Sequence, residues 1–139
     1  MLNWINAAMT EDFSLSDEAR ATFVALLNDD TLDPAMVTYL LSLPSEAYIA
    51  EFSEVVDPQA IHAARKKVQL AMAASLQDEF VDCYRRLTSD APYAPEPAQM
   101  SARALKNLAL AYWAKTSRDG LTAAEQQFAA ADNMTDQMA

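Results

Sequence analysis

Residues 57–88 read DPQAIHAARKKVQLAMAASLQDEFVDCYRRLT, and this stretch decides the fold class. After Pro58 it contains neither glycine nor proline, the residues that most disfavour a helix interior. Its apolar residues recur at steps of three, four or seven, which places them on one face of an α-helix: Ile61, Val68, Met72, Leu76, Phe80, Cys83 and Leu87. The pattern predicts one continuous helix over 58–88, roughly 45 Å long at about 1.5 Å per residue.

Two Asp-Pro pairs mark helix starts in this chain, Asp33-Pro34 and Asp57-Pro58. An aspartate at the N-cap accepts hydrogen bonds from backbone N–H groups of the first turn, and proline fits the first helical position. The first pair predicts a short helix over about 34–43, and the second pair begins the long helix.

Three further helices are predicted in the N-terminal part. Leu2, Ile5 and Met9 share one helical face, and Ser16 begins a second helix that ends near Asn28. The apolar set of that second helix is Ala19, Phe23, Leu26 and Leu27. Ser45 caps an element that extends through Val56, and its expected buried residues are Tyr48, Phe52 and Val55.

The C-terminal part begins with a proline-rich surface loop, followed by a helix over about 98–115. This helix is expected to turn Leu105, Leu108 and Tyr112 inward, with Trp113 at its flank. Gly120 is expected to end the segment with a positive φ.

The last two helices of the chain are predicted from capping residues. Thr122 and Glu125 form a T-x-x-E capping box, which predicts a helix to about residue 131 that carries Phe128. Thr135 is expected to cap a final helix of which residues 136–139 are only the first turn. Because one turn is too short to be stable alone, the sequence suggests a truncated piece of a larger domain.

Composition supports an all-α fold in a single helical region over 1–139. The chain has 139 residues, 52% of them hydrophobic, but only 1 glycine and 6 prolines, and it lacks β-branched runs of strand length. Short helices in succession indicate antiparallel helix pairs stacked as an α-solenoid of the armadillo or HEAT kind. No strict sequence period is present, so any repeat is structural.

Composition also bears on the expected partners and location. The chain has 10 Lys and Arg residues and 20 Asp and Glu residues, which gives a formal net charge of −10 and disfavours binding to nucleic acid. No stretch is long and apolar enough for a membrane span, and the N-terminal residues do not form a signal peptide. With one cysteine and no internal disulfide to form, the expected location is the cytoplasm.

Candidate reactive residues have ordinary structural explanations. His62 lacks both an H-E-x-x-H motif and a cysteine pair, so we expect an exposed helical histidine rather than a metal ligand. Cys83 lies on the apolar stripe, which favours a buried structural thiol over a nucleophile. Asp78 and Asp82, with Glu79 between them, are expected to be solvated carboxylates rather than an acid–base pair.

One basic cluster, residues 65–67, could contact a partner. Its position near the start of the long helix opposes the helix dipole, so it is not there to stabilise that end. The sequence assigns no catalytic residue, no cofactor-binding residue and no metal ligand to this chain.

Four stretches together resemble the C-terminal helical domain of bacterial aminopeptidase N, a zinc metallopeptidase family also called alanyl aminopeptidase. They are TLDPAMVTYLLSLPSE (31–46), DPQAIHAARKKVQLAMA (57–73), ARALKNLALAYWA (102–114) and QFAAADNMTDQMA (127–139). The most specific pieces are LDPA…LPSE, RALKN and NMTD, and their order and spacing match over nearly the whole chain.

The resemblance implies a non-catalytic fragment of a zinc-dependent enzyme that removes N-terminal residues from peptides. In that family the zinc ligands are an H-E-x-x-H motif and a downstream Glu in an earlier domain, and this sequence contains no such motif. The helical domain of the family covers the active site and restricts substrate access. Its implied partners are the catalytic domain, the remaining helices and the peptide substrates of the parent enzyme.

Two consequences remain open at this stage. Faces that would meet missing helices should be apolar and exposed, so the isolated fragment is expected to self-associate. The alternative is a free-standing helical-repeat adaptor that binds a peptide or protein partner on its concave face.

Overall fold

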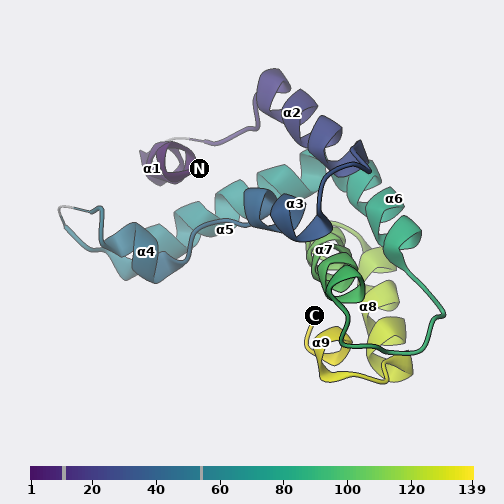
Figure 1. Cartoon of the computed structure of the whole chain (residues 1–139). Coiled ribbons are helices and arrows are strands. Elements are labelled where there is room, and N and C mark those ends of the chain that lie inside the picture. The colour runs from purple at the N-terminus through teal and green to yellow at the C-terminus, as the bar shows by residue number, and fades with distance from the viewer. Residues whose placement is uncertain (11, 54) are drawn as a thin grey trace.

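The structure is a computed structural model that describes residues 1–10, 12–53 and 55–139. These residues form helices and no strands, and the helices stack as an open, curved array (Figure 1). In chain order the helices are α1 (Leu2–Thr10), α2 (Asp17–Asn28), α3 (Pro34–Leu41), α4 (Glu46–Ala50), α5 (Pro58–Ser75), α6 (Gln77–Leu87), α7 (Pro97–Trp113), α8 (Arg118–Ala130) and α9 (Met134–Gln137). The expected all-α class is confirmed.

The predicted N-caps of α2 to α5 are confirmed. Each side chain accepts a hydrogen bond from a backbone N–H of the first turn, as orphan donors at a helix start require. The four capping residues are Ser16, Asp33, Ser45 and Asp57. Local capping chemistry therefore determines where these helices begin.

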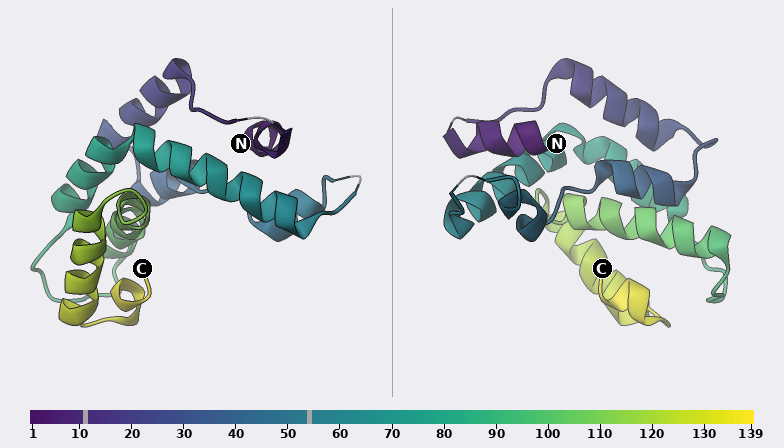
Figure 2. Two further views of the ribbon diagram at one scale, coloured as in Figure 1. Left: turned by 180° about the vertical axis from the view of Figure 1, so that it is seen from behind. Right: turned by 60° about the vertical axis from the view of Figure 1, so that its left-hand side comes forward.

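Three early helices pack on three later helices in the same order: α1 on α5, α2 on α6, and α3 on α7 (Figure 2). In each pair, a side chain of the later helix donates a hydrogen bond to a backbone carbonyl near the C-terminal end of the earlier helix. The three bonds are Lys67 Nζ to Ala8 O (3.0 Å), Arg86 Nη2 to Leu27 O (2.6 Å) and Tyr112 Oη to Leu41 O (3.0 Å). These carbonyls lack intrahelical partners, so successive layers of the array complete one another.

The centre of the core lies where α3, α5, α6 and α7 meet. The rings of Phe80 and Tyr112 stack with their centroids 4.6 Å apart and an interplanar angle of 3°. Tyr112 also places its hydroxyl against Leu41 O and Met72 Sδ, so the one polar atom of this ring is satisfied within the core.

The predicted continuous helix over 58–88 is wrong, because the chain bends at Leu76. Leu76 has φ −121° and ψ 22°, and α5 and α6 diverge sharply from this point (Figure 1). The apolar stripe is nevertheless buried on both sides of the bend, from Val68 to Cys83. A straight helix would have carried one end of the stripe away from the core, whereas the bend keeps both halves in it.

The predicted element from Ser45 through Val56 is also wrong in length and in its buried face. Helix α4 ends at Ala50, and it turns Ile49 inward. The residues expected to be buried are exposed by 47%, 62% and 85%: Tyr48, Phe52 and Val55. The short helix packs on α5 through one turn, so only one large apolar position reaches the core; residue 54 of this expected element lies outside the described residues.

The predicted boundary between α7 and α8 needs correction as well. Helix α8 begins at Arg118, and its N-cap is Ser117, which accepts hydrogen bonds from Asp119 N and Gly120 N. The expected box of Thr122 and Glu125 therefore lies inside the helix. Gly120 is helical and does not have a positive φ.

The requirement for glycine at 120 comes from packing. A Cβ atom at this position would lie 2.6 Å from both the carbonyl carbon and the carbonyl oxygen of Trp113. Glycine thus lets the first turn of α8 approach the last turn of α7.

Candidate functional site

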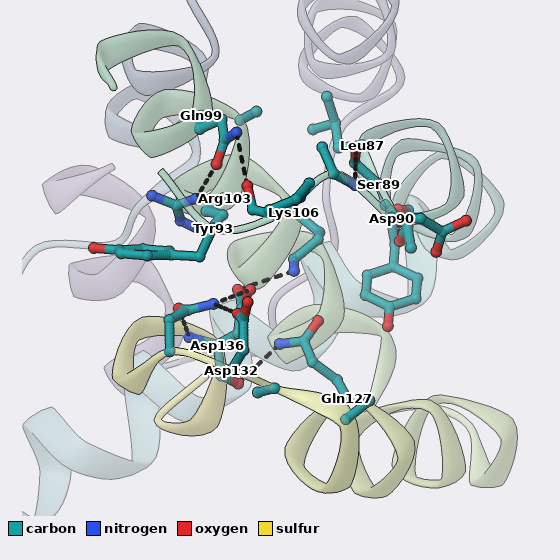
Figure 3. Close-up of a pocket in the computed structure, with 18 of the residues that line it drawn as sticks. Leu87, Ser89, Asp90, Tyr93, Gln99, Arg103, Lys106, Gln127, Asp132 and Asp136 are labelled. Carbon is teal, nitrogen blue, oxygen red and sulfur yellow. Dashed lines mark hydrogen bonds and ion pairs between the residues drawn. The ribbon is translucent and has the colours of Figure 1, made fainter. Parts of the chain in front are cut away.

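The C-terminal end of the array contains a buried ion pair. Lys106 of α7 is only 8% exposed, and it is the one charged residue among the described part of the chain that reaches this degree of burial. Its Nζ lies 2.9 Å from Oδ1 of Asp136 in α9 (Figure 3). Both side chains are well shielded from water, so the attraction between them is screened less than that of a surface pair.

Asn133 prepares the carboxylate for this pairing. It is the N-cap of α9, where its Oδ1 accepts a hydrogen bond from Asp136 N at 3.0 Å. Its Nδ2 donates to Asp136 Oδ2 at 3.1 Å. The expected cap, Thr135, is instead the second residue of the helix, so that prediction is wrong by two positions.

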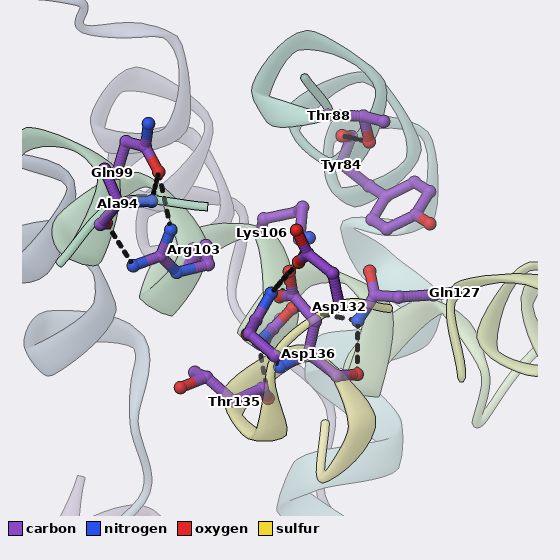
Figure 4. A network of polar contacts seen from close by, with 12 residues as sticks. Tyr84, Thr88, Ala94, Gln99, Arg103, Lys106, Gln127, Asp132, Thr135 and Asp136 are labelled. Atoms are coloured by element: carbon purple, nitrogen blue, oxygen red, sulfur yellow. Dashed lines mark hydrogen bonds and ion pairs between the residues drawn. The ribbon is translucent and has the colours of Figure 1, made fainter. Parts of the chain in front are cut away.

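Two amides connect α9 to α7 and α8 (Figure 4). Asn107, the residue after Lys106, donates a hydrogen bond from its Nδ2 to Thr135 O at 3.1 Å. Gln127 Nε2 donates both to Asn107 Oδ1 at 3.0 Å and to Asp136 O at 3.1 Å. We call these residues the polar lock: Lys106, Asn107, Gln127, Asn133 and Asp136.

The lock sets the charge state of its carboxylate. Burial raises the pKa of Asp136, but the neighbouring polar groups of Lys106, Asn133 and Asn107 and the charge of Lys106 together lower it by more. The pKa of Asp136 therefore lies below its ordinary value, and its carboxylate is charged at neutral pH.

A second set of polar contacts holds the proline-rich loop beside the lock. Arg103 Nη1 donates to Gln99 Oε1 at 2.9 Å, and Nη2 donates to Ala94 O at 3.1 Å. The guanidinium also lies over the ring of Tyr93, 4.7 Å from its centroid. The loop before α7 is thereby fastened to α7 itself.

The lock and this loop surround a hollow of about 520 Å³. Its wall contains the end of α6, the loop before α7, and parts of α7, α8 and α9 (Figure 3). Across residues 1–10, 12–53 and 55–139, no three His, Cys, Asp or Glu side chains are grouped so that they could hold a metal ion. Lys106 and Asp136 bind each other, and Arg103 binds Gln99 and the backbone carbonyl of Ala94, so the chemistry of this arrangement is structural: it holds α7, α8, α9 and the loop before α7 together.

The reactive residues singled out from the sequence do not enter this site. His62 is exposed as expected, and its Nδ1 lies 2.8 Å from Glu46 Oε1. Cys83 is buried as expected, and this burial raises the pKa of its thiol although Arg86 opposes the shift.

The remaining charged candidates differ in their surroundings. Asp78 and Asp82 are exposed as expected, but Glu79 is largely buried and pairs with Arg20 of α2 at 2.8 Å. In the basic cluster 65–67, Arg65 Nε donates to Pro44 O at 2.8 Å. This cluster therefore makes contacts within the chain.

The polar lock was missed by the search for reactive residues, because none of its members belongs to a catalytic or metal-binding motif. A signal was nevertheless present. The motifs RALKN (103–107) and NMTD (133–136), which carry the family resemblance, are the segments that the lock joins.

Among the described residues, no helix has both the length and the apolar character that a membrane span requires.

Comparison with known proteins gives a consistent result. The family model described as "Domain of unknown function (DUF3458_C) ARM repeats" matches residues 1–139. Aminopeptidase N of Haemophilus influenzae is 31% identical over 137 residues, and aminopeptidase N of Escherichia coli is 30% identical over 139 residues. Each of these matches covers 99% of this chain and 16% of the relative.

Two other matches extend the comparison. Aminopeptidase N of Caulobacter vibrioides is 35% identical over 111 residues, which is 79% of this chain and 13% of that protein. The crystal structure of Legionella pneumophila aminopeptidase A in complex with aspartic acid superimposes with a TM-score of 0.80 at 25% identity, over 97% of this chain and 17% of that one.

The chain thus spans less than a fifth of the proteins that it matches, and the matched part has the armadillo-like helical fold expected from the sequence. The chain belongs to the DUF3458_C family of ARM-repeat domains, the C-terminal domain family of bacterial aminopeptidase N.

Proposed function

We propose that residues 1–139 form the first part of the C-terminal helical domain of a zinc-dependent aminopeptidase, and that this part is non-catalytic. The observation that carries the proposal is the asymmetry of coverage. The match to two aminopeptidase N sequences covers 99% of this chain but only 16% of each relative. A shared segment of that kind is a module of a larger enzyme.

We further propose that the domain covers the active site of the parent enzyme and restricts the passage of substrates. The layered helices support this role, because carbonyls at the ends of α1, α2 and α3 are bound by side chains of α5, α6 and α7. Such cross-links between helices oppose local unfolding and keep the array rigid. The polar lock holds α9 in place in the same way.

The proposed partners are the catalytic domain and the remaining helices of the parent chain, with peptides as the substrates of the whole enzyme. Zinc would be held by that catalytic domain and would activate the water that attacks the first peptide bond. The proposed location is the cytoplasm.

The experiment uses the full-length protein whose gene contains this sequence. Its substrates are a chromogenic alanyl amide and a small protein with an N-terminal alanine, offered folded and then unfolded. We expect cleavage of the amide and of the unfolded chain, and little cleavage of the folded protein. Equal rates on the folded and unfolded protein would overturn restricted access, and failure to cleave the amide would overturn the peptidase function.

A further inference from the structure

The segment 58–87 encodes a continuous helix but adopts a bent one. Its apolar stripe has helical spacing throughout, and the bend at Leu76 contains neither glycine nor proline. Leu76 serves as the N-cap of α6 without any side-chain hydrogen bond to the exposed N–H groups. The local sequence therefore does not explain the bend, and its cause must lie in a contact from elsewhere in the fold.

Arg20 of α2 makes that contact. Its Nε donates to the carbonyl of Ser75, the last residue of α5, at 2.9 Å. Its Nη2 donates to Oε1 of Glu79, in the first turn of α6, at 2.8 Å. One guanidinium thus binds both sides of the bend.

The chemistry of these two contacts favours the bent form. In a continuous helix the Ser75 carbonyl would accept the N–H of the residue four positions later, which is Glu79. Arg20 replaces that partner with a charged donor and also pairs with the Glu79 carboxylate in the first turn of α6, where the helix dipole favours a negative charge. The rigid, planar fork of arginine suits two acceptors held at fixed positions.

We propose that Arg20 is a latch that selects the bent form of residues 58–87. It thereby sets the angle between α5, with the helices packed on it, and α6, with the helices packed on it; we call these the first and second halves of the array. Helix α5 carries α1 and α4 and makes a smaller contact with α7, whereas α6 carries α2 and packs on α7 more extensively. Release of the latch lets the first half move relative to the second about Leu76. This proposal does not depend on the peptidase function.

A matched control exists in the same helix pair. Arg86 of α6 also bonds the C-terminal end of α2 through Leu27 O, and the turn after it through Asp30 Oδ1 at 2.9 Å. Its side chain is exposed by 39%, compared with 47% for Arg20. Arg86→Gln therefore removes a comparable link between α2 and α6 without touching the bend. Arg20→Gln removes the link at the bend.

The test measures the distance between two spin labels by pulsed electron spin resonance. The labels are placed at Gln59→Cys on α5 and Asp82→Cys on α6, both exposed positions, in a chain whose buried thiol is removed by Cys83→Ala. A straight helix would separate these positions by about 35 Å at ~1.5 Å per residue. The bent form gives a shorter and narrower distribution.

We expect Arg20→Gln to broaden the distribution toward the length of a straight helix, and Arg86→Gln to leave it unchanged. Arg20→Lys, which keeps the charge but lacks the fork, should give an intermediate width and provides a milder variant if the glutamine variant does not fold. An unchanged distribution in Arg20→Gln or Arg20→Lys would overturn the latch. Equal broadening in Arg20→Gln and Arg86→Gln would also overturn it, because loose docking of α2 would then be the cause.

Discussion

Lys106 and Asp136, on α7 and α9, form an ion pair of 2.9 Å whose two side chains are almost completely shielded from water. The pair joins the two sequence motifs that carry the family resemblance. It also holds a four-residue helix that is too short to be stable by itself. Helix α9 therefore depends on tertiary contacts, and the polar lock supplies them.

Removal of one partner of this pair is expected to destabilise the fold more than removal of both. Lys106→Met leaves a shielded carboxylate without its cation, and we expect a loss of about 1–3 kcal/mol in the free energy of unfolding. The double variant Lys106→Met/Asp136→Asn should recover part of that loss. Urea titrations of a double-mutant cycle measure the coupling.

The control for this cycle is Lys66→Met, at an exposed position of α5. It should change the free energy of unfolding by less than about 0.5 kcal/mol. A cycle without coupling energy would show that the ion pair does not stabilise the attachment of α9.

The same carboxylate predicts a dependence of stability on acid. The pKa of Asp136 is lower in the folded state than its ordinary value of 3.8, so the charged form is favoured by folding. This contribution is present above pH ~4 and is lost as the pH falls through the lower folded-state pKa. Asp136→Asn should weaken the acid dependence of the free energy of unfolding, and an identical slope in the two proteins would contradict this.

The buried phenol of Tyr112 predicts that the folded state loses stability at alkaline pH. Burial raises the pKa of Tyr112 to about 12, above its ordinary value of 10.0. The neutral phenol is therefore favoured by folding, and its contribution is present below pH ~10 and is lost as the pH rises toward 12. Absorbance at the phenolate band should show one tyrosine that titrates only near pH 12.

Substitution of Tyr112 tests its hydrogen bond separately. Tyr112→Phe leaves the carbonyl of Leu41 without its partner in the core, and we expect a loss of about 1–2 kcal/mol in the free energy of unfolding. Tyr39→Phe, at an exposed position of α3, should be nearly neutral. Equal effects of the two substitutions would exclude a stabilising role for the bond to Leu41.

We expect Gly120→Ala to destabilise the fold, whereas the same substitution usually stabilises a helix. Alanine is ordinarily the better residue in a helix interior, by about 1 kcal/mol. At position 120, however, the new Cβ would meet the backbone of Trp113 at 2.6 Å, so we expect destabilisation by about 1–3 kcal/mol. Ala129→Gly measures the ordinary preference at an exposed position of α8, and a stabilised Gly120→Ala variant would refute close packing of α7 and α8.

Exposed apolar side chains predict self-association of the 139-residue chain. Tyr39, Phe52 and Phe128 are each exposed by more than 60%, and Met134 and Met138 are exposed still further than Phe128. We expect sedimentation velocity to give species larger than the monomer as concentration rises, with binding of a hydrophobic dye. A monodisperse monomer that binds no dye would count against this prediction.

Helix starts could be predicted from the sequence where the capping chemistry was local. Ser16, Asp33, Ser45 and Asp57 each satisfy N–H groups within three residues of themselves, so the necessary information is contained in a few positions. The predicted burial of the stripe is confirmed for its residues from Ile61 to Cys83, whereas Leu87 is only partly buried. This burial could be predicted because helical spacing places those residues on one face.

The incorrect predictions concern features that depend on contacts between residues far apart in the sequence. The bend at Leu76 coincides with Arg20, which is 55 positions away from the carbonyl that it binds. Gly120 looked like a helix end, but its role depends on the backbone of Trp113. The polar lock brings 106–107 against 133–136, and no local pattern announces such a contact. Only the family resemblance had marked these two motifs together.

We propose that this chain is a non-catalytic part of an aminopeptidase, and one assay tests this proposal directly. Hydrolysis of a chromogenic alanyl amide, with added zinc, is measured for the 139-residue chain and for the full-length product of its gene. We predict that only the full-length product is active. Activity of the 139-residue chain itself, or inactivity of both proteins, would contradict the claim.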